Sequence, residues 1–247
     1  VTVFTLDPDS SRRRGSKVDF NVTIGYDQLE PEDLELLTPL FGFTEVQSNA
    51  LYMLRRRLGT AWVRRLLAEE PDETLIAILE SNQLHEGTLG AIKRKLEQLR
   101  RFDFLVDKAP DDPIGRILDY INSNVSVILE FGRYGNALEA YILVANYITR
   151  RIHQAYVDRK ESALGGKGNE PRPLVITIEE AHKFLDPAIA RHTIFGTIAR
   201  EMRKYNVTLL VVDQRPSGID PEVMSQIGTR VTALLDEEND IRAVFSG

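Results

Sequence analysis

The sequence contains no cysteine, which excludes disulfide bonds and cysteine-ligated zinc sites. It also lacks any apolar run that approaches the roughly 20 residues of a membrane-spanning helix, and no signal peptide opens it. Its histidines show no metal-ligand spacing with one another, so surface or core roles are expected for all of them: His85, His153, His182 and His192. From these absences we expect a protein of the cytoplasm that has no membrane partner.

The charge balance limits the partners that the chain can bind. A net charge of -6 at pH 7 argues against a wholly basic nucleic-acid binder. The net charge does not exclude a local basic channel, because the 31 Lys+Arg residues can cluster on one surface. A hydrophobic content of 43% supports a core, and 247 residues are enough for one large α/β domain or for a core with a helical insertion.

A further absence concerns phosphate binding. The chain has no G-x-x-x-x-G-K-[ST] segment, the loop whose backbone amides and lysine hold the phosphates of a nucleotide. The Gly-Gly-Lys-Gly run at 165–168 has the wrong spacing and precedes a strand, and Gly-Ser-Lys at 15–17 precedes no helix. We interpret both runs as plain loops. Val1 is not an initiator methionine and opens a strand-like segment, so we expect the chain to begin inside a larger protein.

The first 24 residues have the pattern of strands. Residues 1–6 are predicted to form a buried strand, and 10–17 a polar, basic loop. Apolar and polar residues alternate over 18–24, which predicts a half-buried strand.

Residues 31–105 have helical spacing instead. Thr44 and Gln47 form a capping-box signal for a helix that runs to about residue 69. We interpret 31–105 as a helical insertion, whose basic residues favour a solvated helix face over a nucleic-acid contact. A later helix in this region carries four apolar residues on one face, namely Leu89, Ile92, Leu96 and Leu99.

Strands alternate with helices in the rest of the chain. The segment 207–212 is apolar without alternation, which predicts a strand buried on both faces. A Gly/Pro-rich stretch at 162–173 is predicted to be a mobile loop. The rhythm predicts an α/β fold with a mostly parallel sheet and helices on both sides. The expected strands are 125–131, 174–178, 207–212 and 231–235, and the expected helices are 136–159 (capped by Asn136), 186–204, one opening at 220–221, and 237–244.

Two adjacent carboxylates follow one of these strands. Glu179 and Glu180 come at the end of 174–178, and Gln214 follows the strand 207–212. The ends of parallel strands meet at one edge of a sheet, where α/β proteins place ligand sites. One carboxylate can hold a Mg²⁺ shell while the next activates a water, and an amide can bond a phosphate or that water. Capping of the strand ends is the alternative reading of these polar residues.

Two arginines between these strands have two readings. Arg200 and Arg203 lie one turn apart at the predicted C-terminus of a helix, where cations are favourable for structural reasons alone. They could also stabilise the charge of a transferring phosphoryl group, in cis or in a neighbouring subunit. Spacing alone does not choose between these roles.

Three ordered segments give the chain a family resemblance. Glu-Glu-Ala-His-Lys-Phe at 179–184, Ile-Ala-Arg-Glu-Met-Arg-Lys-Tyr at 198–205 and the block 214–226 resemble the HerA family of hexameric DNA-translocating ATPases, in the wider HerA/FtsK group. The match covers about 120–247, and the opening residues 3–9 resemble the strand that follows the phosphate-loop helix of that family. The resemblance implies a RecA-like P-loop NTPase core at 1–30 and 106–247, interrupted by a variable helical insertion at 31–105.

The resemblance also implies a role for each site residue. Glu179 would be the Mg²⁺-side carboxylate of the Walker B motif, and Glu180 the catalytic carboxylate that positions the attacking water. Gln214 would sense the γ-phosphate, and Arg203, ahead of Arg200, would act across a subunit interface. Two further positions, Gln226 and Arg230, would lie near the site or interface, and His182 would be structural or support the site.

For the whole protein, the resemblance implies an ATP- and Mg²⁺-dependent homo-hexamer. It would move double-stranded DNA through a basic pore in DNA end processing, with a NurA-type nuclease as partner, or a defence-system partner in other branches. Two departures from the family are Asp213, where many relatives carry Ser or Thr, and the missing phosphate loop, which should lie just upstream of Val1. The alternatives are a non-catalytic ATPase-like scaffold, or a DNA pump of the conjugation or partitioning type.

Overall fold

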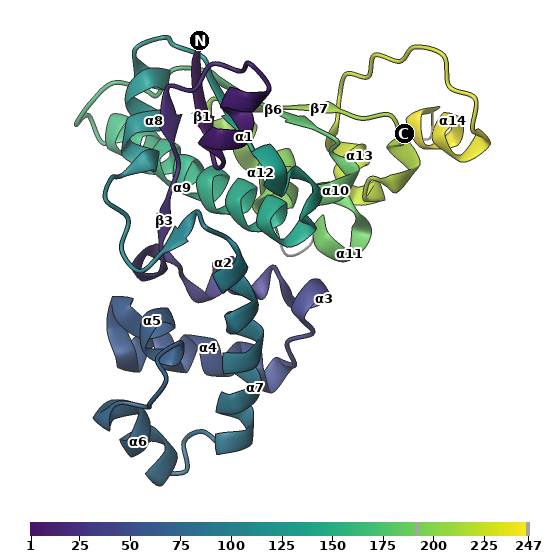
Figure 1. Ribbon diagram of the computed structural model, residues 1–247. Coiled ribbons are helices and arrows are strands. Elements are labelled where there is room, and N and C mark those ends of the chain that lie inside the picture. Colours follow the sequence, from purple (N-terminus) through teal and green to yellow (C-terminus); the bar gives the residue numbers. More distant parts are fainter. Residues whose placement is uncertain (191–192, 246–247) are drawn as a thin grey trace. The chain divides into compact units, whose positions relative to one another are not determined.

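The computed structural model describes residues 1–190 and 193–245, and the side chains of 200–203 lie outside that description. Helices alternate with strands, and every strand pairing in the described part of the chain is parallel, so the predicted α/β class is confirmed. The chain divides into two compact units, Val1–Leu143 and Val144–Gly247. Figure 1 labels their elements.

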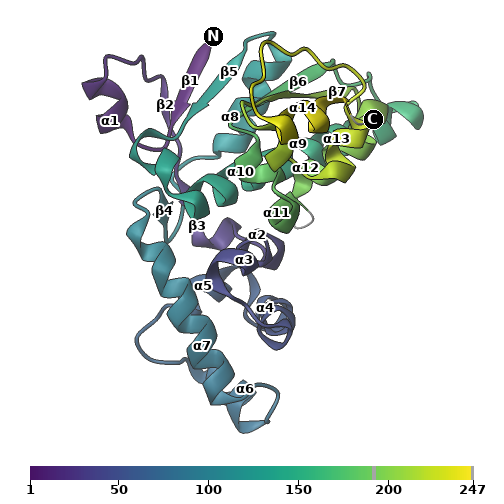
Figure 2. The ribbon, with the colours of Figure 1, turned by 90° about the vertical axis from the view of Figure 1, so that its right-hand side faces the viewer.

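The first unit is built on the strand β1 (Thr2–Thr5), which pairs with two others. β2 (Phe20–Asn21) lies on one side and β5 (Val127–Glu130) on the other, and Figure 2 shows β1 and β5 side by side. Thr5 is opposite Glu130, so the carboxyl ends of both strands reach the same edge. The strands predicted at 1–6 and 125–131 are confirmed.

The segment after β1 differs from the expected basic loop. Pro8–Arg13 forms a short helix, α1, because Asp7 accepts a hydrogen bond from the backbone N–H of Ser10 at its N-terminus and Pro8 occupies the first helical position. The sequence carried this signal in Asp7-Pro8, but the arginines that follow favoured a loop. The helix therefore presents its arginines at the carboxyl edge of the sheet.

The single strand expected at 18–24 is two strands with different partners. β2 pairs with β1, whereas β3 (Ile24–Gly25) pairs with β4 (Leu105–Val106). Val22, between them, is fully buried. The prediction was wrong because alternation indicates extended backbone and does not reveal a change of neighbour.

The stretch between β3 and β4 is helical, as expected. That residues 31–105 form an insertion separate from the core stays a prediction. The helix after Thr44 has the predicted capping box but stops at Leu58, earlier than the predicted residue 69, because Gly59 adopts a φ of 68°. The elements here are η1 (Tyr26–Gln28), α2 (Pro31–Glu35), α3 (Thr38–Phe41), α4 (Glu45–Leu58), η2 (Gly59–Ala61), α5 (Trp62–Leu66), α6 (Glu73–Glu80), α7 (Glu86–Glu97) and η3 (Gln98–Arg101).

The apolar face predicted for the later helix is confirmed at three of its four positions, whereas Leu89 is only half-buried. Ile92, Leu96 and Leu99 are fully buried along α7 and η3. The unit continues with α8 (Pro113–Asn122), β5 and η4 (Gly132–Asn136).

A long helix, α9 (Leu138–Leu164), carries the chain from the first unit into the second. It begins two residues after the predicted cap Asn136, which lies in η4, and it extends past the expected end into the segment expected to be a loop. Ile142, Ile148 and Ile152 are buried, as predicted. Charged residues interrupt α9, and no helix in the described ranges is both long and apolar enough to cross a bilayer.

The second unit contains the parallel pair β6 (Leu174–Glu179) and β7 (Val207–Val212), adjacent in both views. Both predicted strands are confirmed, but β7 is not buried on both faces. Val207 is buried, whereas Leu210 and Val212 are 49% and 46% exposed. The helix α12 packs on β7, and nothing in the described residues covers the other face of the pair.

The helix predicted at 186–204 is broken into pieces: α11 (Pro187–Ala190), α12 (Ile194–Glu201) and η5 (Met202–Tyr205), with 191–192 outside the described residues. The backbone N–H of Ile194 donates to the Asn146 side chain at 2.8 Å, which provides α12 with its own N-terminal cap. A short helix, α10 (His182–Leu185), precedes α11.

The last part of the chain has helices where expected and no strand where one was expected. The structure has η6 (Pro216–Gly218), α13 (Pro221–Gln226) and α14 (Glu238–Phe245). The segment 231–235 is irregular, and Val231 and Leu234 are 94% and 89% exposed. The strand prediction was wrong here because β-forming side chains produce a strand only where a neighbouring strand pairs with them.

Candidate functional site

The carboxyl ends of β6 and β7 lie beside each other, as predicted. Glu179 is the last residue of β6 and is paired in register with Val212, the last residue of β7. The next residues along the two strands are Glu180 and Asp213, followed on the β7 side by Gln214. The structure therefore brings the two glutamates and Gln214 to one edge of a parallel sheet, where α/β proteins bind ligands.

The backbone turns sharply at Glu180. Its φ is 53°, in the left-handed region that residues other than glycine rarely adopt. The helix α10 begins almost at once, and its first turn is closed by a hydrogen bond from Lys183 N–H to the Glu180 carbonyl at 2.9 Å. This turn leaves the side chain of Glu180 half-exposed at the edge of the sheet.

Asp213 explains how the two strand ends are held together. Its carboxylate is 4% exposed and accepts hydrogen bonds from the backbone N–H groups of His182 and Arg215, both at 2.6 Å. One oxygen also lies 2.9 Å from Nδ1 of His182. The Asp213 carboxylate thus ties the loop after β7 to the start of α10.

His182 links Asp213 to Glu180. Its Nδ1 faces Asp213, and its Nε2 lies 3.9 Å from Oε2 of Glu180. Lys183 Nζ lies at the same distance, 3.9 Å, from that carboxylate oxygen. A carboxylate that accepts from Nδ1 fixes the tautomer and orientation of a histidine ring. His182 therefore presents a defined nitrogen to Glu180.

The two remaining site residues face outward. Glu179 and Gln214 are both exposed, and the Gln214 side chain makes no hydrogen bond with the residues that the structure describes. An exposed carboxylate, a second carboxylate beside Lys183 and an amide form a polar edge that can bind a hydrated cation and orient a water. Their individual roles stay predictions.

Two of the expected arginines cannot be placed. Arg200 lies in α12 and Arg203 lies in η5, but the side chains of both are outside the described part of the structure. Arg230 has a structural contact instead of one with the site, because its guanidinium donates to the carbonyls of Val244 at 2.6 Å and Met224 at 2.8 Å. Gln226 is exposed and donates to Ser225.

The chemistry of the edge fits Mg²⁺ bound with a nucleotide. No cluster of three or more metal-binding side chains occurs in the described part of the chain. A Mg²⁺ ion that accompanies a nucleotide needs only one or two carboxylates, because phosphate oxygens and waters complete its octahedron. Glu179 can supply that carboxylate, directly or through water.

Sequence reasoning missed Asp213 as the anchor of the site. The signal was present, because an aspartate that precedes a loop commonly accepts a hydrogen bond from the backbone two residues later, as Asp213 does from Arg215. The long-range partner His182, 31 positions away, had no local signal.

The fold and the polar strand edge define the class of the protein. Parallel strands with helices between them and carboxylates at the strand ends are typical of P-loop NTPase-like domains. The chain belongs to the family of the helicase HerA central domain, whose sequence profile matches residues 1–152.

Curated relatives carry names from the same family. The chain is 26% identical over 224 residues to the DNA double-strand break repair helicase HerA of Sulfurisphaera tokodaii, which covers 81% of this chain and 43% of the relative. It is 30% identical over 169 residues to the protein of that name from Sulfolobus acidocaldarius, covering 66% of this chain and 32% of the relative. The counterpart from Saccharolobus solfataricus is 29% identical over 162 residues, 61% of this chain and 30% of the relative. The chain thus spans less than half the length of these relatives.

Proposed function

We propose that this chain carries the hydrolytic carboxylates of an ATP-driven motor that translocates or unwinds double-stranded DNA during DNA end processing. The observation that supports the proposal most directly is the register of β6 and β7, which brings Glu179, Glu180 and Gln214 to one sheet edge. The membership of the HerA family and the names of the relatives support DNA as the track.

Each site residue has a role in this proposal. Glu179 holds the Mg²⁺ that, when bound, neutralises the phosphate oxygens of ATP. Glu180 accepts a hydrogen bond from the attacking water and orients it toward the γ-phosphate. Gln214 bonds a γ-phosphate oxygen from the neighbouring strand end.

We infer that three further residues support this machinery. Asp213 fixes the ring of His182, and Nε2 of His182 and Nζ of Lys183 each lie 3.9 Å from the Glu180 carboxylate. These neighbours restrict the space in which the side chain of Glu180 can turn. The extra carboxylate at position 213 is already committed to three donors and so does not repel a phosphate.

The assembly of the motor is proposed from the family. A homo-hexameric ring would let Arg203, or failing that Arg200, contact the phosphates bound by the adjacent subunit. A nuclease of the NurA type would act on the end of the DNA that leaves the ring. The chain contains no phosphate-loop motif, so the proposal assigns to it only the carboxylate side of the hydrolytic site.

The test uses the full-length protein and two variants of the carboxylate pair. We expect Glu180→Gln to bind ATP with Mg²⁺ as the wild type does and to lose hydrolysis by about a hundredfold or more, because the amide cannot accept the proton of water. Glu179→Gln should lower turnover and should also raise the Mg²⁺ concentration that hydrolysis requires. Near-normal turnover of Glu180→Gln would refute the catalytic assignment of Glu180, whereas a wild type that hydrolyses no ATP would favour a non-catalytic, ATPase-like scaffold.

A further inference from the structure

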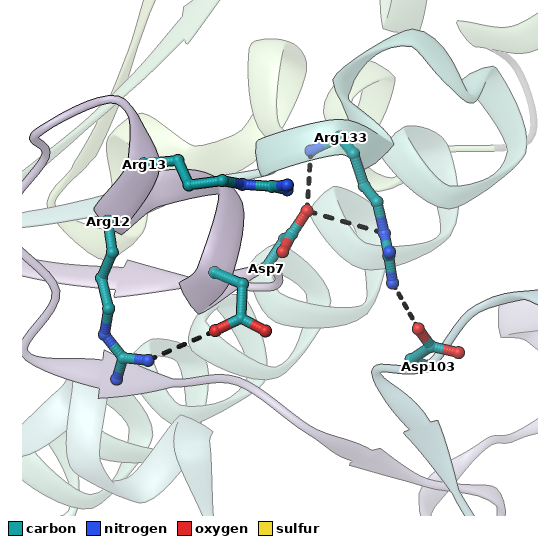
Figure 3. Close-up of a pocket in the computed structure, with 6 residues that line it drawn as sticks. Asp7, Arg12, Arg13, Asp103 and Arg133 are labelled. Carbon is teal, nitrogen blue, oxygen red and sulfur yellow. Dashed lines mark hydrogen bonds and ion pairs between the residues drawn. The ribbon is translucent and has the colours of Figure 1, made fainter.

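A second polar site lies in the first unit, apart from the residues assigned above. A cavity of about 600 Å³, within the size range of ligand pockets, opens at the carboxyl ends of β1 and β5 (Figure 3). Three arginines and three aspartates line it: Asp7, Asp9, Arg12, Arg13, Asp103 and Arg133. The loop after β1 and α1 contribute the first four residues, and η4 contributes Arg133.

Asp7 forms the fixed inner wall of this pocket. Its side chain is 6% exposed and accepts hydrogen bonds from the N–H groups of Ser10 at 3.1 Å and Arg133 at 3.3 Å. Burial raises the pKa of Asp7, but these hydrogen bonds and the charges of Arg133 and Arg13 outweigh it, so the pKa lies below its ordinary value. Asp7 therefore stays ionised and holds Arg133 in place.

Gly132 allows the two loops to approach this closely. Its φ is 58°, and a Cβ at this position would lie 2.5 Å from Cβ of Asp7. Any side chain at position 132 would push the loop after β5 away from Asp7. The position of Arg133 at the pocket is thus built into the backbone.

At the mouth of the pocket two arginines pair with exposed carboxylates, although Arg133 also keeps its ion pair with the buried Asp7. Arg12 pairs with Asp9 at 3.4 Å, and these side chains are 66% and 84% exposed. Arg133 pairs with the exposed Asp103. Exposed ion pairs of this kind contribute little free energy, so their arginines can exchange partners readily.

Arg13 lacks even such a partner. Its guanidinium makes no hydrogen bond or ion pair with the described residues, although its charge acts on Asp7. Figure 3 shows it extending from α1 toward Asp7 and Arg133. A planar guanidinium next to two others at a concave surface is suited to bind an anion with several oxygens.

We propose that this arginine pocket binds a phosphate group, with Arg12, Arg13 and Arg133 as its donors. Guanidinium groups bind phosphate bidentately and more strongly than they bind an exposed carboxylate, so a phosphate displaces Asp9 and Asp103 from their arginines. Two sources carry this chemistry, the backbone of duplex DNA and the phosphates of a nucleotide. The assignment of duplex DNA as the source rests on the proposed function, whereas the phosphate chemistry does not.

The experiment measures phosphate binding to the full-length protein and its variants. The probes are a fluorescein-labelled blunt DNA duplex, followed by anisotropy over a salt series, and inorganic pyrophosphate and ATP, followed by calorimetry. For Arg12→Gln/Arg13→Gln we expect about a tenfold loss of duplex affinity and a salt slope smaller by about two. Equal thermal unfolding midpoints show that the variant is folded.

Two further variants separate a pocket from a general basic surface. Arg14→Gln removes a charge from the same run, but Arg14 pairs with Glu130 and does not line the cavity, so we expect wild-type affinity. Asp9→Asn removes the competing carboxylate and should tighten binding a few-fold. An affinity loss in Arg14→Gln as large as that in Arg12→Gln/Arg13→Gln, or weaker binding by Asp9→Asn, overturns the pocket.

The probes also identify the source of the phosphate. Loss of duplex affinity alone supports the DNA backbone, and loss of pyrophosphate and ATP affinity alone supports a nucleotide. Unchanged binding of all three probes by Arg12→Gln/Arg13→Gln refutes the pocket, even if ATP hydrolysis by the wild type confirms the motor. If the wild type hydrolyses no ATP, but the double variant binds pyrophosphate more weakly than the wild type does, the pocket is supported and the motor is refuted.

Discussion

The replacement Asp213→Ala tests whether one carboxylate joins the two strand ends of the site. The Asp213 side chain is 4% exposed and accepts from the backbone N–H groups of His182 and Arg215, both at 2.6 Å. A hydrogen bond to a charged group contributes about 1.5–3 kcal/mol, and 1.4 kcal/mol is a factor of ten in an equilibrium. The opening of each amide should therefore become about 10- to 100-fold more favourable in Asp213→Ala.

Amide hydrogen exchange measures this change at the two bonds themselves. We expect the His182 and Arg215 amides to exchange faster in Asp213→Ala, while amides of the first unit keep their rates. Asp213→Asn retains one acceptor oxygen, so its exchange rates at His182 and Arg215 should lie between those of Asp213→Ala and the wild type. The imidazole should also lose its fixed orientation, so on the proposed function we expect ATP turnover by the full-length protein to fall without a matching loss of ATP affinity.

Asp220→Ala is the matched control, because it removes the same charge from the same unit. Asp220 accepts from the N–H groups of Glu222 at 2.9 Å and Val223 at 3.2 Å, at the start of α13. Its loss should speed exchange of those amides and leave His182 and Arg215 protected. Unchanged exchange of His182 and Arg215 in Asp213→Ala would refute the reasoning.

Two further predictions concern stability. Asp72 accepts a hydrogen bond from Arg65, which holds the pKa of the Asp72 carboxyl below its ordinary value of 3.8, so the stabilisation by this pair is full above pH 3.8 and is lost as the pH falls through the lower, folded-state pKa. The difference in unfolding free energy between the wild type and Asp72→Asn should therefore disappear in acid. Urea unfolding followed by the fluorescence of the single, buried Trp62 measures this difference, and a difference that stays constant with pH would contradict the prediction. Glu180→Gly should raise the unfolding free energy by about 1 kcal/mol relative to Glu180→Ala, because only glycine relieves the φ of 53°, and equal circular-dichroism urea midpoints for the two variants would show that the turn is not strained.

Local patterns were enough to predict most elements of the fold. The strands at 174–178 and 207–212 follow from apolar runs, and their parallel pairing follows from the helices between them. The capping box at Thr44 marked the start of α4 correctly. These features depend on neighbours within one or two turns, which a sequence displays directly.

The errors occurred where a distant partner decides the structure. The backbone at 18–24 divides between two sheets, and 231–235 has no strand beside it in the described structure. The long helix expected at 186–204 is interrupted because Asn146 caps Ile194 from α9. None of these partners is close in sequence, so periodicity could not reveal them.

The candidate site divides in the same way. Glu179, Glu180 and Gln214 were found from strand ends, because the carboxyl edge of a parallel sheet is predictable. The bond between Asp213 and His182, and the pocket that joins α1 to η4, depend on tertiary packing. The basic run after β1 was identified, but its place at a cavity was not.

The measurement that tests the central claim most directly is ATP hydrolysis by the full-length protein with and without duplex DNA. We predict Mg²⁺-dependent hydrolysis that blunt duplex stimulates, and its loss in Glu180→Gln with ATP binding retained. Hydrolysis that is absent from the wild type, or that persists in Glu180→Gln at the wild-type rate, would contradict the claim that the β6 edge is the hydrolytic half of a DNA motor.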